Sequence, residues 1–300
     1  MAAATLRNYL VDERHRIRLR ELVMREVETL CESVANEYPS VDHSVPDSLQ
    51  KLLSRYEAAT EMVLTLIING CYWGDQQHEE IWINSLQRVA SCYEDRPRHR
   101  GADFALYPAL ILLYGAGIAA LAGDRYTAFA ALLTKAHYLE KGREWPIALY
   151  LYPGAVLGSE YGHLLEGLAG SVTPLNGYLY NKLRQSVREF LPRETQYEEY
   201  FDRFEYLSAL VFADLSEKAG KGITGPPGRF SWRYTRRDMG PSIQGKIDLE
   251  LKNGGKVEAL CKSGLFNGSL DRFQLIKTAF DEEQANMKRS WLPPTFHGIG

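Results

Sequence analysis

The residues with the clearest binding chemistry form a basic and aromatic strip towards the C-terminal end of the chain. Arginine side chains can neutralise phosphates, and tryptophan and tyrosine rings offer faces on which nucleic-acid bases stack. A glycine- and proline-rich stretch, residues 220–228, precedes the strip, so we expect an exposed loop there. A loop whose rings dock on the domain is the simpler interpretation, but the strip is still the best candidate site. Its partner-binding candidates are Arg229, Trp232, Arg233, Tyr234, Arg236 and Arg237.

A second segment has the spacing of a dinucleotide-binding fingerprint. Gly115, Gly117 and Ala120 form the pattern G-x-G-x-x-A after an apolar run. Glu140 follows about where an acidic residue would bind ribose. This pattern would make the chain a nucleotide-dependent enzyme. Both flanks, however, have helical periodicity, and no alternation of strands and helices follows Glu140, as a doubly wound sheet requires. We therefore treat this function as the alternative.

Other motifs for acid–base or metal chemistry are incomplete. His78 and Glu79 begin like the helix of a zinc protease, but Trp82 occupies the position of the second histidine ligand. Ser159 lacks the flanking glycines of a nucleophile elbow, and the other histidines are scattered. The sequence therefore predicts no metal site and no cofactor, and it identifies no catalytic residue.

Charge and cysteine content exclude further classes of protein. A formal net charge of −3 rules out a globally basic nucleic-acid binder. The N-terminus has no apolar segment behind a basic one, so we predict neither a signal peptide nor an anchor, and the early helical pattern is what a fragment of a longer chain would show. No C-x-x-C pair occurs, so we expect four buried free thiols in a reducing cytoplasm. These are Cys31, Cys71, Cys92 and Cys261.

The central segment, residues 104–138, is the most apolar part of the chain. No charged side chain occurs between Phe104 and Gly123, a length that could cross a bilayer. Pro108, two glycines and the absence of a basic cluster at either end argue against a membrane span. A turn at residues 122–126 joins two helical halves, so we predict a buried αα-hairpin that forms the core. The face of the first helix that is expected to pack on the second helix contains Leu113, Gly117 and Leu121.

Much of the remaining chain has apolar residues at three- and four-residue steps, the mark of amphipathic helices. The first of these helices begins with Arg16, Arg18 and Arg20, at the helix end where the macrodipole disfavours positive charge. These arginines hint at other partners, although a solvated face explains them more simply. We expect residues 140–158 to be irregular, although the short apolar run between Pro146 and Pro153 is also compatible with a strand or one buried turn. The expected helices cover residues 16–38, 48–70, 78–95, 104–138, 158–168, 174–191 and 194–219, with a capped helix after Ser269.

Together these patterns predict an all-α protein built as an irregular multi-helix array of helical hairpins. The cadence is like that of tetratricopeptide hairpins, but no fixed period recurs, so we do not expect a regular solenoid. Shifts in composition suggest three parts. These are a helical core domain at residues 1–219, a linker with the basic-aromatic strip at 220–241, and a small C-terminal helical segment, 242–300, packed on the core.

Three stretches carry a resemblance to a known kind of protein region. They are RIRLRELVMREVETL, FALYPALILLYGAGIAALAGDRYTAFAALL and KSGLFNGSLDRFQLIKTAFDE. With them the chain resembles a poorly characterised helical region that lies C-terminal to sirtuin-like, TIR or Schlafen-AlbA-type domains in bacterial proteins, several of them linked to phage defence. The resemblance implies a sensor, scaffold or oligomerisation role and carries over no catalytic residue.

These observations lead to one functional expectation. We expect a non-catalytic, cytoplasmic module of a larger bacterial protein that works in interaction, sensing or oligomerisation. Its partner would be another protein or a second copy of the chain, with weak nucleic-acid or nucleotide contact at the strip and no membrane.

Overall fold

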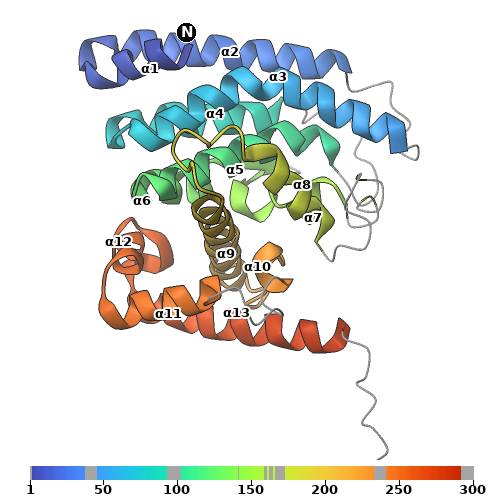
Figure 1. The fold of residues 1–300 in the computed structure, drawn as a ribbon, viewed down its shortest axis with the longest axis vertical. Helices are drawn as coiled ribbons and strands as arrows, with labels where there is room; N and C mark the ends of the chain where they lie inside the picture. The colour runs from blue at the N-terminus through green and yellow to red at the C-terminus, as the bar shows by residue number, and fades with distance from the viewer. Residues whose placement is uncertain are drawn as a thin grey trace, which may run out of the picture.

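The structure is a computed structural model that describes residues 2–37, 46–92, 103–140, 142–158, 161, 165, 173–232 and 241–291. Over these ranges it is an irregular all-α array with one two-stranded sheet, which confirms the predicted fold class. Figure 1 shows α1 to α6 at one end of the molecule and α11 to α13 at the other, with α9 between them. The helices are α1 Ala2–Val11, α2 Arg16–Glu37, α3 Pro46–Trp73, α4 Glu79–Ser91, α5 Tyr107–Ala122, α6 Tyr126–Thr134, α7 Pro153–Val156, α8 Pro174–Leu183, α9 Glu194–Lys218, α10 Arg229–Trp232, α11 Ile243–Asn253, α12 Lys256–Lys262 and α13 Leu270–Trp291.

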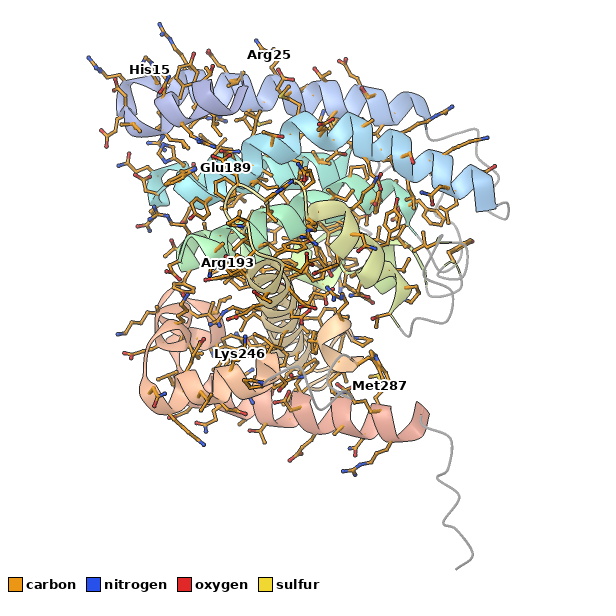
Figure 2. All side chains as sticks on the ribbon, viewed as in Figure 1. His15, Arg25, Glu189, Arg193, Lys246 and Met287 are labelled. Atoms are coloured by element: carbon orange, nitrogen blue, oxygen red, sulfur yellow. A yellow bond between two sulfur atoms is a disulfide. The ribbon has the colours of Figure 1, made fainter. Side chains whose placement is uncertain are left out.

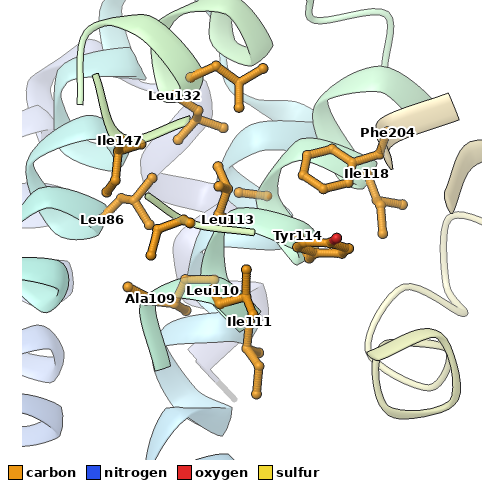
Figure 3. Packing of buried hydrophobic residues seen from close by; sticks show 14 of the residues in the cluster. Leu86, Ala109, Leu110, Ile111, Leu113, Tyr114, Ile118, Leu132, Ile147 and Phe204 are labelled. Atoms are coloured by element: carbon orange, nitrogen blue, oxygen red, sulfur yellow. The ribbon is translucent and has the colours of Figure 1, made fainter. Parts of the chain in front are cut away.

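Helix α5 is the core of the fold, as the uncharged segment predicts. The apolar stretch Phe104–Ala122 is long enough to cross a membrane, but it is completely buried by protein. Helices α3, α4, α6 and α9 all contact α5, so it has an apolar neighbour on every side. Helix α5 is therefore a buried core helix of this fold. Figure 3 shows the α5 side chains meeting residues of four other elements, namely Leu86, Leu132, Ile147 and Phe204.

Two glycines, which the sequence pattern assigns to a helix end and to the αα-hairpin contact, lie where helices pack closely. Gly70 does not end α3, because it lies inside the helix under the Trp82 indole of α4, where an added Cβ would stand 2.0 Å from the ring. Gly117 has its nearest neighbour in Phe204 of α9, not in α6. The sequence therefore predicts the αα-hairpin of α5 and α6 but misses the closest contact of Gly117.

The chain after α6 forms a short hairpin where the sequence predicts the end of a helix and then irregular structure. Strands β1, His137–Glu140, and β2, Arg143–Pro146, pair antiparallel with Tyr138 opposite Trp145. Gly142 has φ of +75°, a conformation that glycine adopts without strain and that short hairpin loops require. Because the chain enters strand β1 at His137, helix α6 ends at Thr134, four residues earlier than expected.

The C-terminal helices pack on α9 through both apolar and charged contacts. Helices α11 and α13 contact α9 directly. The buried Arg203 of α9 forms a two-pronged ion pair with Glu250 of α11, at 2.7 and 2.6 Å. The glycine- and proline-rich stretch is packed at Gly225, because a Cβ there would lie 2.8 Å from the Ala209 carbonyl and 2.9 Å from Phe280. The expected linker thus contacts both α9 and α13 at Gly225, whereas its first residues, 220–222, are exposed.

Two of the four cysteines form a disulfide. Cys31 of α2 is bonded to Cys92, which follows α4, so the expectation of four free thiols is wrong for this pair. The two residues are 61 positions apart and meet only because α2 packs on α4. Cys71 and Cys261 are free and buried, as expected.

Thiol titration in denaturant checks this pairing. We expect two reactive thiols per chain without reductant and four after reduction, because only Cys71 and Cys261 are free. A Cys92→Ser variant should titrate three thiols without reductant, since it releases Cys31. Four thiols in the unreduced parent chain would contradict the disulfide.

Candidate functional site

The basic-aromatic strip begins inside the protein. The Arg229 guanidinium lies 3.5 Å from the centroid of the Tyr180 ring and 3.4 Å from Glu198 Oε1. The neighbouring Phe230 is buried against Tyr206 of α9. Trp232, at the end of α10, is half-buried. The charge of Arg229 is therefore already matched by groups of the chain itself.

The other candidates of the strip cannot be placed. Arg233, Tyr234, Arg236 and Arg237 lie outside the described residues. The structure therefore brings together only the first two members of the predicted site, and nucleic-acid contact at the strip stays a prediction.

The dinucleotide fingerprint is not arranged as a phosphate-binding turn. Gly115, Gly117 and Ala120 all lie within helix α5 and are buried. A Cβ on Gly115 would stand 2.6 Å from Leu64 of α3, which shows how closely α3 covers this segment. The fingerprint needs a strand, a turn and a helix in succession, and residues 103–136 contain no strand.

A buried carboxyl group, Glu205, organises the polar contacts around the start of the strip. Its Oε1 accepts hydrogen bonds from Asn176 Nδ2 at 2.7 Å and from the Tyr114 hydroxyl at 3.2 Å. Its Oε2 accepts the backbone N–H of Arg229 at 2.8 Å. The pKa of Glu205 is raised to about 7, chiefly by burial and in smaller part by the nearby Asp202 charge, while the hydrogen bonds from Asn176 and Arg229 and the Arg229 charge act in the opposite direction.

The cavity beside Glu205 is too small for a substrate. It measures about 30 Å³ and is lined by polar atoms of Tyr114, Asn176 and Ser208 among apolar side chains. This volume suits one or two water molecules, which need polar partners of this kind. A carboxyl group that titrates near neutral pH could serve as a general base, but here it joins α5, α8, α9 and α10.

A basic groove between α2 and α4 is a further candidate site at the surface. It has a volume of about 300 Å³ and is lined by Arg16, Ile17 and Arg20 from α2 and by Glu80, Ile81 and Asn84 from α4. Ile17 is 72% exposed, which is unusual for an isoleucine, and Val11 at the end of α1 is 88% exposed. We call the six lining residues the basic groove.

Among the described residues, no acidic side chain pairs with either groove arginine, and the same holds for Arg18 of the same helix. Arg16 and Arg20 form no ion pair with any other described residue, whereas Arg14 pairs with Asp12 and Arg25 with Glu26. They are one helical turn apart, so they share a face of α2. Arg25 lies on the outer face of α2, away from α3 (Figure 2).

Only half of this site could be found in the sequence. The basic start of α2 stands out because the positive end of the helix dipole disfavours arginines there. The opposing wall, Glu80 to Asn84, becomes part of the site only when α4 packs on α2. No pattern in the sequence indicates that pairing.

Comparisons with family models, curated proteins and solved structures found no match for this chain. Among the described residues, no group of three or more histidine, cysteine, aspartate or glutamate side chains is arranged to hold a metal ion.

Proposed function

We propose that this chain is a helical interaction module that binds an acidic segment of a partner protein in the basic groove. The observation that carries this proposal is the pair Arg16 and Arg20, two unpaired arginines one turn apart beside the exposed Ile17. Arginine binds carboxylates through paired hydrogen bonds and is enriched at the centres of protein interfaces. Such a pair gains more from a carboxylate than from water.

The groove also suggests the pattern of the bound segment. Arg16 and Arg20 stand on the α2 wall, where carboxylates would bind, and the helix dipole of α2 would favour the same negative charges. Ile17 on the rim and Ile81 in the groove offer apolar surface for a side chain between those carboxylates. Glu80 on the α4 wall repels acidic residues and so favours a segment with its charges on one side. An acidic segment with an apolar residue at its centre fits these features.

The wider setting of this function rests on the resemblance of three stretches of the chain to helical regions of bacterial proteins. In that setting the module acts in the cytoplasm as a sensor, interaction or oligomerisation part of a larger protein linked to phage defence. The partner that carries the acidic segment is then another protein or a second copy of this chain.

Calorimetric titration with a short peptide tests the groove. The probe is a seven-residue peptide with four glutamates around a central leucine, titrated at low ionic strength. We expect the double variant Arg16→Ala, Arg20→Ala to bind it at least about tenfold more weakly, since charge-assisted hydrogen bonds contribute about 1.5–3 kcal/mol each. Binding by the parent chain should also weaken as salt is added.

A matched control separates a site from general attraction. The double variant Arg18→Ala, Arg25→Ala removes the same charge from other positions of α2 and should bind nearly as well as the parent chain. Equal weakening in both variants would contradict a specific groove. Stronger binding of single-stranded DNA than of the peptide would replace the protein partner by a nucleic acid.

A further inference from the structure

A second cavity, separate from the basic groove, lies where three connections of the chain meet. It measures about 350 Å³, which is within the range of sites for small ligands. Figure 1 shows α12 beside α6, and this contact forms one side of the cavity. The walls come from the α3–α4 connection, the α5–α6 turn and the end of α12, and they include Gly74, Asp75, Glu79, residues 124–128, Ala259, Lys262 and Ser263.

Glu79 is a buried charge in the wall of this cavity. The residue is 6% exposed, and its Oε1 accepts no hydrogen bond from any described residue. Its carboxylate also forms no ion pair within the described part of the chain. The first turn of α4 favours a negative charge at this position but supplies no full counter-charge. Because a buried carboxylate without a cation is costly, a cation in the cavity would stabilise it.

The other carboxylates at the cavity are already in use. Asp75 Oδ1 lies 2.8 Å from Nδ1 of His78 in the turn before α4. Asp124 Oδ1 lies 3.0 Å from Nζ of Lys256. Both side chains are largely exposed, so water also screens them. Glu79 is therefore the acidic group that lacks both solvent and a partner.

The two cations of the cavity wall are committed elsewhere. Lys262 forms an ion pair with Glu258 at 2.6 Å, and the Arg125 Nε donates to the Tyr72 carbonyl at 3.3 Å. The wall thus carries three carboxylates against two cations. The excess negative charge lies at Glu79.

We propose that this cavity binds a guanidinium or ammonium group carried on a flexible chain, with Glu79 as its counter-charge. An organic cation fits because its several N–H donors can pair with the Glu79 carboxylate while its flexible chain extends through the rest of the cavity. The half-buried Tyr126 adds an aromatic ring in the wall, on which a planar guanidinium can stack. The cation is either a free small molecule or a basic side chain of a protein partner.

Thermal unfolding with two probes tests the site and distinguishes its sources. The probes are agmatine and a five-residue peptide with one central arginine, each at low ionic strength. We expect agmatine to raise the melting temperature of the parent chain, because a ligand that binds only the folded state stabilises it. Tighter binding of agmatine indicates a free small cation, and tighter binding of the peptide indicates a basic side chain of a partner.

Three variants make the result specific. Glu79→Gln keeps the shape but removes the charge, so its affinity for either probe should fall at least tenfold, while its own melting temperature is unchanged or higher. Glu61→Gln makes the same change at an exposed position of α3 and should bind like the parent chain. Thr127→Trp fills the cavity from its rim and should also abolish binding if Glu79→Gln fails to fold.

Two results would contradict the proposed cation site. No shift of the parent chain by either probe, or equal binding by the parent chain and a folded Glu79→Gln variant, would remove the proposal. Neither outcome bears on the acidic-peptide titration, because the basic groove shares no lining residue with this cavity.

Discussion

Replacing Gly117 by leucine is expected to destabilise the folded chain by about 3 kcal/mol or more, at or above the upper end of the usual range for core insertions. A Cβ at this position would stand 2.1 Å from Cε2 of Phe204, far inside the contact distance of two carbon atoms. The Phe204 ring cannot move away easily, because it is 1% exposed and packs against the rings of Tyr114 and Phe129. Helix α9 would have to shift as a unit. Chemical denaturation followed by circular dichroism measures the loss.

Two further variants show whether this contact is the cause. Gly245→Ala makes the smaller change in helix α11, where the nearest atom to an added Cβ is Ser242 Oγ at 3.5 Å. It should be neutral or stabilising by up to about 1 kcal/mol, since alanine favours helix over glycine. Adding Phe204→Leu to Gly117→Ala should recover part of the stability lost by the single change. A Gly117→Leu chain with unchanged stability would mean that α5 and α9 do not pack in this way.

The helices could be predicted because their signal is local. The buried stripe of α2 is visible as Leu19, Val23, Val27 and Leu30, which recur at helical spacing and are all buried. The charge-free run that becomes α5 is compatible with a core helix, a membrane span or a dinucleotide-binding turn, and its proline, its glycines and its helical flanks favour the core helix. Errors arise where a long-range contact overrides the local signal. Gly70 is typical of a helix end, yet α3 continues past it because Trp82 covers it.

The candidate sites depend on contacts that the sequence does not encode locally. Arg229 is typical of an exposed phosphate-binding loop, but its partners Tyr180 and Glu198 come from helices that precede it by 30 residues or more. In the sequence, His78 and Glu79 match only the start of a zinc motif. The burial of Glu79 follows from the way the α3–α4 connection, the α5–α6 turn and α12 meet. Both sites therefore require the packing to be known.

The second large effect is a dependence of stability on pH that is set by Glu205. We expect the free energy of unfolding to fall by about 3 kcal/mol as pH rises from about 4.5 to about 7 through this residue. The ordinary pKa of a glutamate is 4.5 and that of the buried Glu205 is about 7. At low pH both the folded and the unfolded state are protonated, so Glu205 carries no penalty. Between the two pKa values the unfolded state ionises and is favoured, and above the folded pKa the loss is complete.

Burial dominates this shift, since the groups facing Glu205 act in both directions. Asp202 on the same helix adds a like charge that raises the pKa, while Asn176 of α8 and Arg229 of α10 stabilise the carboxylate and lower it. Tyr114 of α5 stays protonated because burial raises its own pKa well above the ordinary value, so it remains a donor. The carboxylates with lowered pKa values, such as Asp12, lose their contribution only at more acidic pH.

Denaturation of the parent chain and of Glu205→Gln across this pH range measures the slope. The free energy of unfolding of the variant should change little over the pH range in which the parent chain loses stability, because glutamine does not titrate. A glutamine amide facing the Arg229 N–H adds a cost that is the same at every pH, so the slope and not the absolute stability is the readout. Glu61→Gln, with its exposed carboxyl group removed, should keep the parent slope. Parallel curves for the parent chain and Glu205→Gln would show that Glu205 is ionised in the folded protein throughout this range.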